Sequence, residues 1–299
     1  MSAIKQYAGR STFRKRKMIP YLWLAPALII MIVLLAVPMF ESLRNSFTNG
    51  ELYDSPEFVG LKNYQKLFAT GEFQISLVNT LKFTVFSVAL QMILGLICAL
   101  ALEKIVFAKS IFRSITLMPM MLTPVIVALC WRLFWDTDFG VFNSLRQSLG
   151  MAPISWLGQT NTAPWAIIIT DVWQNASYVT MFMLAGLQGI PKDYHEAATI
   201  DGANFFAELR HITLPLLKPM IMLSLIIRTL FAFRLFEPTY ILTNGGPDNS
   251  TLQLSLYVYR LGFRYFQTAR AAALSWVMVI ICMAVTLVYM KMLGEANHE

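Results

Sequence analysis

Charge is the scarcest property of this 299-residue sequence, in which 14% of residues are charged and 57% are hydrophobic. Soluble domains usually carry about 25% charged residues, and a soluble chain of this length could not bury so much apolar surface. Cysteine is also scarce. Cys98, Cys130 and Cys282 fall in apolar segments without paired spacing, which argues against a disulfide framework or a cysteine metal site. These absences indicate a membrane protein.

Several activities lose support because their motifs are missing. No Gly-x-x-x-x-Gly-Lys-[Ser/Thr] segment occurs, so the sequence has no phosphate-binding loop for ATP. His195-Glu196 begins like the His-Glu-x-x-His motif of zinc proteases, but Thr199 stands where the second histidine belongs. The net charge of +7 forms no groove-sized basic patch, which argues against a nucleic-acid partner. We therefore expect no catalytic residue and no metal site.

Long apolar runs are abundant. A helix needs about 20 apolar residues to cross the hydrocarbon core of a bilayer, which is roughly 30 Å thick. Six segments reach this length and are predicted to span the membrane: residues 18–40, 77–102, 114–135, 164–189, 219–242 and 271–290. Pro119 and Pro124 predict a kink in the third segment. The predicted fold class is all-α, a polytopic membrane protein with six transmembrane helices.

Lysine and arginine are distributed unevenly between the two sides of these segments. With the amino terminus in the cytoplasm, 13 of the 24 lie on the cytoplasmic side and 7 on the outer side, as the positive-inside rule requires. The first segment is too long for a signal peptide and is interpreted as a retained anchor. The predicted organisation is a basic cytoplasmic N-terminus (1–17), a transmembrane domain (18–290) and a cytoplasmic tail (291–299).

One cytoplasmic loop, residues 190–218, is unusually long and polar. Proline sets the φ of a first helical turn and acidic residues early in a helix complement its dipole, so a short helix is predicted over Pro191–Ile200. Asp201-Gly202 would end it, and Ala203–Ile212 resumes helical spacing. Such a loop is too polar for lipid and too small for a domain. A docking surface for a cytoplasmic partner and an ordinary solvated hairpin remain equally open on composition alone.

The residues of this loop resemble the signature of the permease subunits of ATP-binding-cassette (ABC) importers. The matching positions are Glu196, Ala197, Ala198, Gly202, Ile212, Leu214 and Pro215. Asp201 before the glycine and Ala203 after it resemble the carbohydrate branch, with maltose-, trehalose- and glycerol-phosphate-type permeases. Weaker matches in the right order extend over most of the chain: Val59-Gly60-Leu61, Asn63-Tyr64, Asn79-Thr80, Arg228, Phe233, Phe236, Thr243 to Pro247 and Ser250-Thr251.

The resemblance implies a type I ABC importer permease in the bacterial inner membrane. The loop would form a coupling helix on a separate ATPase dimer, which would bind ATP and Mg, so no cofactor is expected on this chain. The implied partners are that ATPase, a second related permease, an extracytoplasmic substrate-binding protein, membrane lipid and a sugar as cargo. Glycerol phosphate is the alternative cargo. An ion-coupled secondary transporter is a rival class, although it would not explain the loop signature.

Polar residues within the predicted spans are candidates for a substrate path, because ionisable groups at membrane depth are costly. Amide, guanidinium and aromatic groups suit a hydroxyl-rich sugar, and the candidates are Asp171, Gln174, Asn175, Arg228 and Phe233. The alternative is that Asp171 pairs with an arginine and only locks helices together. Lys82 and Arg132 lie near span ends, where a long side chain can reach the interface, and are interpreted as structural.

Overall fold

The computed structural model of the protein describes residue 21 and residues 23–50, 57–105 and 107–296, with side chains as far as residue 291. These residues contain no β-strand, only an isolated bridge between Thr48 and Phe58. The predicted all-α class is confirmed for this part of the chain. The predicted basic N-terminus, residues 1–17, lies outside the described residues.

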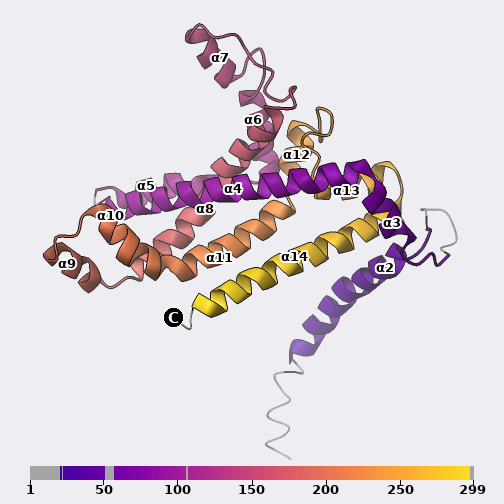
Figure 1. Ribbon diagram of the computed structural model, residues 1–299, viewed down its shortest axis with the longest axis horizontal. Coiled ribbons are helices and arrows are strands. Elements are labelled where there is room, and N and C mark those ends of the chain that lie inside the picture. The colour runs from indigo at the N-terminus through magenta and orange to yellow at the C-terminus, as the bar shows by residue number, and fades with distance from the viewer. Residues whose placement is uncertain (1–20, 22, 51–56, 106, 297–299) are drawn as a thin grey trace, which may run out of the picture.

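A bundle of long helices forms the body of the molecule (Figure 1). The α-helices are α2 (Val37–Ser46), α3 (Lys62–Ala69), α4 (Gly71–Lys104), α5 (Lys109–Leu117), α6 (Pro124–Phe134), α7 (Val141–Ser148), α8 (Ala163–Gln188), α9 (Lys192–Ile200), α10 (Phe205–Glu208), α11 (Leu214–Phe233), α12 (Glu237–Leu242), α13 (Leu254–Tyr259) and α14 (Thr268–Ala296). Four shorter segments of the described chain have 3₁₀ or π winding: η1 (Ile32–Ala36), η2 (Met118–Met121), η3 (Leu209–Thr213) and η4 (Arg260–Arg264). In Figure 1, α9 lies at one end of the bundle and α3 and α13 lie at the other.

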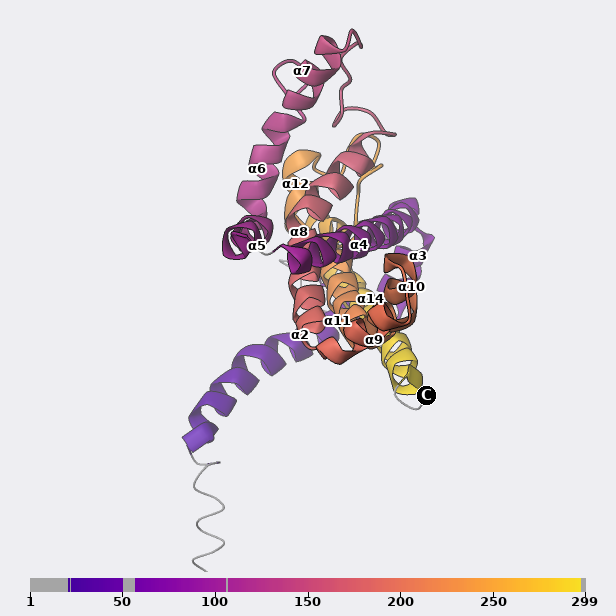
Figure 2. The same cartoon turned by 90° about the vertical axis from the view of Figure 1, so that its left-hand side faces the viewer.

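Within the described residues, four helical stretches are long and apolar enough to cross a membrane. They are Trp23–Ser46, Gly71–Lys104, Phe205–Leu242 and Thr268–Lys291, and they match the first, second, fifth and sixth predicted spans. The bent pair Lys109–Met121 and Pro124–Phe134 adds a fifth if it is one span, and it matches the third. None of the apolar stretch of Trp23–Ser46 is buried within the chain, and Figure 2 shows α2 leaving the bundle.

Helix α8 occupies the position of the predicted fourth span, but it is less apolar than the others. Its 26 residues give a length of about 39 Å, sufficient for a bilayer. The sequence Asp171-Val172-Trp173-Gln174-Asn175 introduces three strongly polar side chains near its middle. The count of six spans therefore remains a prediction, whereas four or five apolar spans are established.

The predicted kink in the third segment is confirmed. The helix pair Lys109–Met121 and Pro124–Phe134 is bent by 97°, and Thr123, immediately before Pro124, has an extended backbone. Proline disfavours the α conformation in the residue that precedes it, so the helix ends before Pro124 and restarts in a new direction. Pro119 lies in the 3₁₀ segment η2.

Polar side chains of α8 bind the backbone carbonyls near this break. Gln174 Nε2 donates to the carbonyl of Leu122 at 2.8 Å, and Ser177 Oγ donates to that of Thr116 at 2.7 Å. Unsatisfied backbone groups are costly within a bilayer, where water cannot replace a lost partner. The polar residues of α8 therefore stabilise the broken helix, which explains part of the polarity of α8.

Helices α4 and α8 approach each other closely at Gly95. A Cβ atom at this position would lie 2.5 Å from Cβ and Cγ1 of Val179 and 3.1 Å from the backbone nitrogen of Thr180. Because Val179 is fully buried, it has no free space into which it can move. Glycine is thus required for the distance between these helices.

Replacing Gly95 with alanine is expected to lower the thermal unfolding temperature of the detergent-solubilised protein. Overpacking costs about 1–3 kcal/mol, which exceeds the gain of about 1 kcal/mol from the better helix propensity of alanine. Gly71→Ala is the matched control, because a Cβ there would meet no atom within 4 Å. An unchanged or raised unfolding temperature for Gly95→Ala would contradict this packing.

The end of the bundle with α3 and α13 is held by a turn that joins α12 to α13. Asn79 Nδ2 of α4 donates to the carbonyls of Asn249 at 2.8 Å and Leu252 at 3.1 Å. The hydroxyls of Thr243 and Thr251 lie 2.7 Å apart and close the turn. The bonds from Asn79 attach this turn to the first third of α4.

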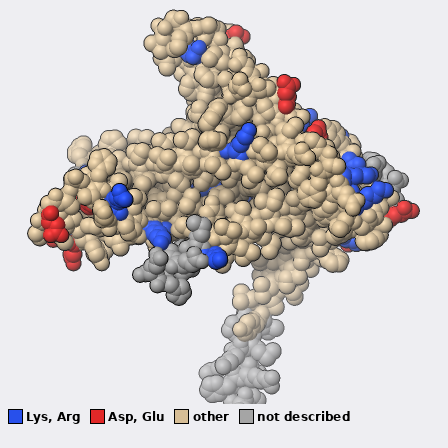
Figure 3. All heavy atoms as spheres, in the orientation of Figure 1, with Lys and Arg blue, Asp and Glu red and all other residues tan. Residues whose placement is uncertain are grey.

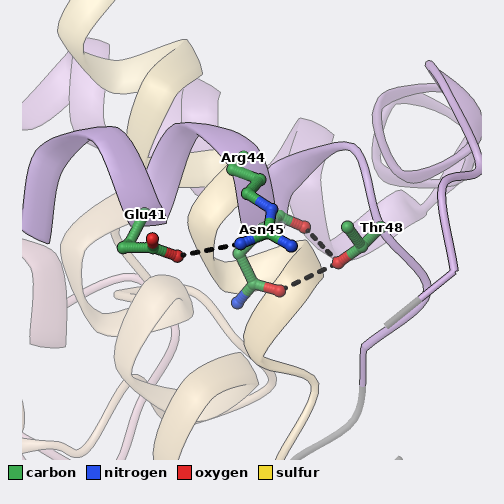
Figure 4. A network of polar contacts seen from close by, with 4 residues as sticks. All are labelled: Glu41, Arg44, Asn45 and Thr48. Atoms are coloured by element: carbon green, nitrogen blue, oxygen red, sulfur yellow. Dashed lines mark hydrogen bonds and ion pairs between the residues drawn. The ribbon is translucent and has the colours of Figure 1, made fainter. Parts of the chain in front are cut away.

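A small polar network lies at the end of α2 (Figure 4), and α3 binds the backbone beside it. Thr48 Oγ1 donates to the carbonyl and side-chain oxygens of Asn45, both at 2.9 Å, just after α2 ends. Arg44 and Glu41 form an exposed pair at 3.7 Å, which contributes little to stability because water screens it. Asn63 Nδ2 of α3 donates to the carbonyls of Ser46 and Thr48. The buried amide of Asn63 is therefore the stronger link.

Candidate functional site

A polar hairpin, residues 190–214, projects from one end of the bundle and includes α9 (Figure 1). Gly202 has a φ of +72°, which an L side chain rarely adopts. The backbone nitrogens of Ala203 and Gly202 donate to the carbonyls of Ala198 and Thr199 at 2.9 and 3.2 Å. This bond pair is a Schellman motif, with glycine at the position that needs positive φ. Gly202 therefore ends α9 and reverses the chain.

The second half of the hairpin is helical and merges with the fifth span. Asn204 Oδ1 accepts a bond from the backbone nitrogen of Ala207 at 2.9 Å and caps α10. The helix then passes through the π segment η3 into α11, and Pro215 lacks the N–H that would bond back in an α-helix. The predicted order of helix, glycine turn and helix holds, but the second helix begins at Phe205 and continues into the bundle.

The eight predicted coupling residues have different exposures along this hairpin. Glu196, Ala197, Asp201, Gly202 and Pro215 are exposed, Ile212 and Leu214 are half-buried, and Ala198 is buried. Four large apolar side chains are also exposed here: Tyr194 at 50%, Ile200 at 86%, Phe205 at 42% and Phe206 at 76%. In Figure 3 acidic residues lie at this end of the molecule. The hairpin thus presents apolar and acidic groups that the described chain does not cover.

Two contacts hold the hairpin in shape. His195 Nδ1 of α9 contacts a carboxylate oxygen of Glu208 of α10, which ties the two short helices together. Lys104 Nζ, at the end of α4, lies 4.1 Å from the ring centroid of Phe205. Sequence reasoning did not identify either contact, because the partners are far apart in the sequence. These contacts therefore tie α9 to α10 and the hairpin to α4.

A second constellation lies inside the bundle, where α4, α8 and α11 meet. Asp171 of α8 is 1% exposed and accepts hydrogen bonds from three side chains. Ser87 Oγ donates to it, Gln91 Nε2 donates at 2.7 Å, and Asn175 Nδ2 donates at 2.7 Å. A buried carboxylate is retained only when such partners replace its hydration. The network thus surrounds a buried carboxyl group with hydrogen-bond donors.

Gln91 connects Asp171 to Arg228. Arg228 Nε donates to Gln91 Oε1 at 2.8 Å, while the amide nitrogen of Gln91 binds Asp171. Among the described residues no direct ion pair joins Arg228 to Asp171. The guanidinium carbon of Arg228 also lies 5.7 Å from the ring centroid of Tyr178. Aspartate and arginine are therefore linked through an amide instead of the direct pair considered from the sequence.

A cavity of about 360 Å³ borders this network. Its lining includes four of the predicted substrate-path residues: Asp171, Gln174, Asn175 and Arg228. Phe233 is elsewhere, 3% exposed in an apolar cluster with Leu252 and Leu256. Phe231, Arg234 and Glu237 line the cavity instead. The structure thus brings together the polar candidates but not the aromatic one.

Two residues of the network, Ser87 and Gln91, were missed from the sequence. Both are fully buried on α4 within an otherwise apolar run. Gln91 was a detectable signal, because an amide in the middle of a membrane segment needs a buried partner. Serine gives no such signal, since its hydroxyl can bond to its own helix. Their positions became informative only when α4 and α8 were placed side by side.

The fold and these two constellations define a class: an all-helical membrane protein with a buried polar network and a polar hairpin at one end. The family model described as "Binding-protein-dependent transport system inner membrane component" matches residues 91–294, and the chain belongs to this family. The matched range contains the hairpin and the Gln91, Asp171 and Arg228 network. The protein is thus a transport subunit of the permease type.

The chain is similar in sequence to named permease proteins and in fold to a solved transporter. The trehalose/maltose transport system permease protein MalF of Thermococcus litoralis is 38% identical over 91% of this chain and 92% of its own length. The arabinooligosaccharides transport system permease protein AraP of Bacillus subtilis is 33% identical over all of this chain and 96% of its own. A bacterial ABC transporter that imports alginate superimposes with a TM-score of 0.83 at 24% identity, covering 93% of this chain and 96% of that one. This last similarity supports the fold.

Proposed function

We propose that this chain is the permease subunit of an ATP-driven ABC importer that moves a sugar across the bacterial inner membrane. The observation that carries the proposal is the polar hairpin, in which Glu196, Ala197 and Ala198 lie on a short helix ended by Gly202. Exposed Ile200 and Phe206 beside them leave apolar surface uncovered on the described chain. A partner protein that covers this surface would account for the apolar side chains that the hairpin exposes.

The proposed topology has six crossings, with α8 as the fourth and both termini in the cytoplasm. Contacts between elements support it at both ends. Lys104, which ends the second crossing, touches Phe205, which begins the fifth. At the other end Thr268 Oγ1, which begins the sixth, donates to the carbonyl of Gly50 at 3.1 Å, just after the first. If the six helices cross the membrane one after another, the two segments joined by each contact lie on the same side of the membrane.

Coupling would occur through α9 as it sits on a separate ATPase that binds ATP and Mg. The hairpin is stiffened by the His195–Glu208 contact, and it continues as one helix into α11. A displacement of α9 by the ATPase would therefore reach Arg228 and the cavity through a single helical path. ATP would favour one arrangement of the subunits through its differential affinity for the closed ATPase dimer.

The proposed substrate path includes the cavity beside Asp171, Asn175 and Arg228. Amide and guanidinium groups donate hydrogen bonds to sugar hydroxyls, and the exposed ring of Phe231 offers an aromatic face. Sugar as the cargo is supported by the named cargo of the relatives from Thermococcus litoralis and Bacillus subtilis. Arg228 and Arg234 also favour a phosphorylated polyol, which is the second candidate.

The proposed assembly contains a second, related permease, the ATPase dimer and an extracytoplasmic binding protein. The family description supports the binding protein. The first span supports a further membrane partner or lipid, because its apolar stretch is not covered by the described chain. Purification of the tagged chain from mild detergent tests this assembly. An ABC ATPase and a second permease in the purified complex are expected, and a chain that purifies alone from freshly solubilised native membranes would contradict the proposal.

A further inference from the structure

A second cavity lies near the outer end of the bundle and is not part of the proposed substrate path. It has a volume of about 220 Å³ and lies between α4, the start of α8 and the turn before α13. Its polar lining includes Lys82, Thr160, Ser250 and Gln253. Phe83 and Ile167 supply apolar walls, and no acidic side chain lines it. The cavity is therefore suited to a small anionic or hydroxylated group.

Two buried polar atoms in this lining have no hydrogen-bond partner among the described residues. They are Oε1 of Gln253, whose side chain is 3% exposed, and Oγ of Ser250. A buried polar atom without a partner costs about 1–3 kcal/mol. Lys82 is exposed, and no ion pair with it is found in the part of the chain that the structure describes. Three residues that line this one space, Lys82, Ser250 and Gln253, thus carry polar groups without a partner among the described residues.

The position of Lys82 along α4 places the cavity near the membrane surface. α4 has 34 residues and is about 51 Å long, roughly 20 Å longer than the hydrocarbon core. With this excess shared between both ends, Lys82 lies about 6 Å below the outer boundary, within reach of the headgroups for a lysine side chain. Its helical neighbours Val78, Val85 and Phe86 are exposed at 46%, 64% and 45%. These apolar groups offer a surface for lipid chains.

An aromatic pair beside the cavity supports the same depth. Trp165, which follows the lining residue Pro164, is 46% exposed, and its ring lies 5.2 Å from that of Phe86. Exposed tryptophan is enriched where lipid chains meet the headgroups. Lys82 therefore faces the region of a bilayer that contains phosphate groups.

We propose that this cavity binds the phosphoglycerol headgroup of a phosphatidylglycerol molecule in the outer leaflet. The phosphate accepts a hydrogen bond from the Lys82 ammonium. The Ser250 hydroxyl and Gln253 Oε1, which are closed to solvent in the free chain, turn toward the headgroup when it binds and bond to the phosphate and to a glycerol hydroxyl. The cavity is smaller than the roughly 300–1,000 Å³ of pockets for drug-sized ligands, so the acyl chains remain outside along Val78 and Val85. A choline headgroup lacks the hydroxyl donor and adds a cation beside Lys82.

Thermal unfolding of the purified full chain in detergent tests this proposal, with dioleoyl phosphatidylglycerol, dioleoyl phosphatidylcholine or free glycerol 3-phosphate added. Phosphatidylglycerol is expected to raise the unfolding temperature more than the other two. Lys82→Gln is expected to weaken the apparent affinity for this lipid at least fivefold. Lys66→Gln, at an exposed lysine of α3 outside the cavity, keeps the wild-type affinity.

The other results would each overturn the assignment. Equal shifts with both lipids would remove the role of the glycerol headgroup. An equal shift with free glycerol 3-phosphate would assign the cavity to a soluble phosphate compound. An unchanged affinity in Lys82→Gln would place the lipid elsewhere on the chain. Because Lys82 is exposed, its substitution leaves the packing of α4 intact.

Discussion

Replacing Gly202 with valine is expected to reduce ATP-dependent uptake at least tenfold, while the chain still reaches the membrane. Gly202 has a φ of +72° in the Schellman turn that ends α9. The left-handed conformation costs an L residue about 1–2 kcal/mol, and a β-branched side chain makes it a genuine outlier. A Cβ at this position would meet no atom within 4 Å. The substitution thus changes the turn without a clash inside the bundle.

The matched control is Gly202→Asn, because asparagine tolerates the left-handed region better than other side chains. This variant is expected to retain most of the uptake. Membrane amounts are compared by immunoblot, and uptake of labelled substrate is measured in cells. Wild-type uptake with valine at position 202 would remove the turn from the coupling mechanism. An equal loss of uptake in the two variants would show that the size of the side chain at position 202, and not the backbone conformation, causes the loss.

Replacing Asp171 with asparagine is expected to destabilise the folded protein by at most about 3–5 kcal/mol, the cost of breaking a direct buried ion pair, because Gln91 lies between the two charges here. Arg228 is 4% exposed and is linked to Asp171 through Gln91. Loss of the carboxylate leaves the guanidinium with no negative group in the network. The unfolding temperature in detergent measures this loss. Arg44→Gln, which removes an exposed pair, is the control and costs less than about 1 kcal/mol.

The double variant Asp171→Asn with Arg228→Gln separates stability from transport. Without either charge, the interior contains only amides, so most of the stability is expected to return. Uptake is expected to stay at least tenfold reduced, because the guanidinium that faces the cavity is absent. Recovery of uptake together with stability would show that the pair only holds α4, α8 and α11 together. That result would overturn the proposed substrate path at Arg228.

The hairpin was the part of the site that the sequence predicted best, for local reasons. Helix α9, its end at Gly202 and the helix after it depend on neighbouring residues, so short-range patterns were sufficient. The fusion of that second helix with α11 was not expected, because helical spacing was predicted only over Ala203–Ile212 and the fifth span was predicted to begin at residue 219. The π segment η3 lets the helix continue toward Pro215, and Pro219 lies within α11.

The buried network was predicted only in part, because it depends on contacts between distant segments. Asp171, Asn175 and Arg228 were identified by their charge or amide groups within apolar segments. Gln91 was not identified, although its amide joins Asp171 to Arg228. Phe233 was assigned to the path by type alone, and the rotation of α11 directs it into the apolar core. The rotation of a helix about its own axis depends on how the helices pack, so the sequence alone did not predict which way Phe233 faces.

The number of membrane spans is harder to predict, because polar side chains with a structural or functional role interrupt the apolar pattern of α8. Helix α8 is long enough to cross a bilayer, but the residues that bind the broken third segment and the network reduce its apolarity. Hydropathy treats these side chains as solvent-exposed, whereas Asp171 and Gln174 are buried and hydrogen-bonded. A polar helix between apolar ones is what a polar interior requires.

Uptake into proteoliposomes tests the proposed function most directly. Vesicles contain the co-purified complex with its ATPase, and sugar-loaded binding protein is supplied outside. We predict uptake that requires ATP inside the vesicle and that falls at least tenfold with Gly202→Val. Uptake by vesicles that contain this chain alone, driven by an ion gradient without any ATPase, would contradict the proposal and assign the protein to the secondary transporters.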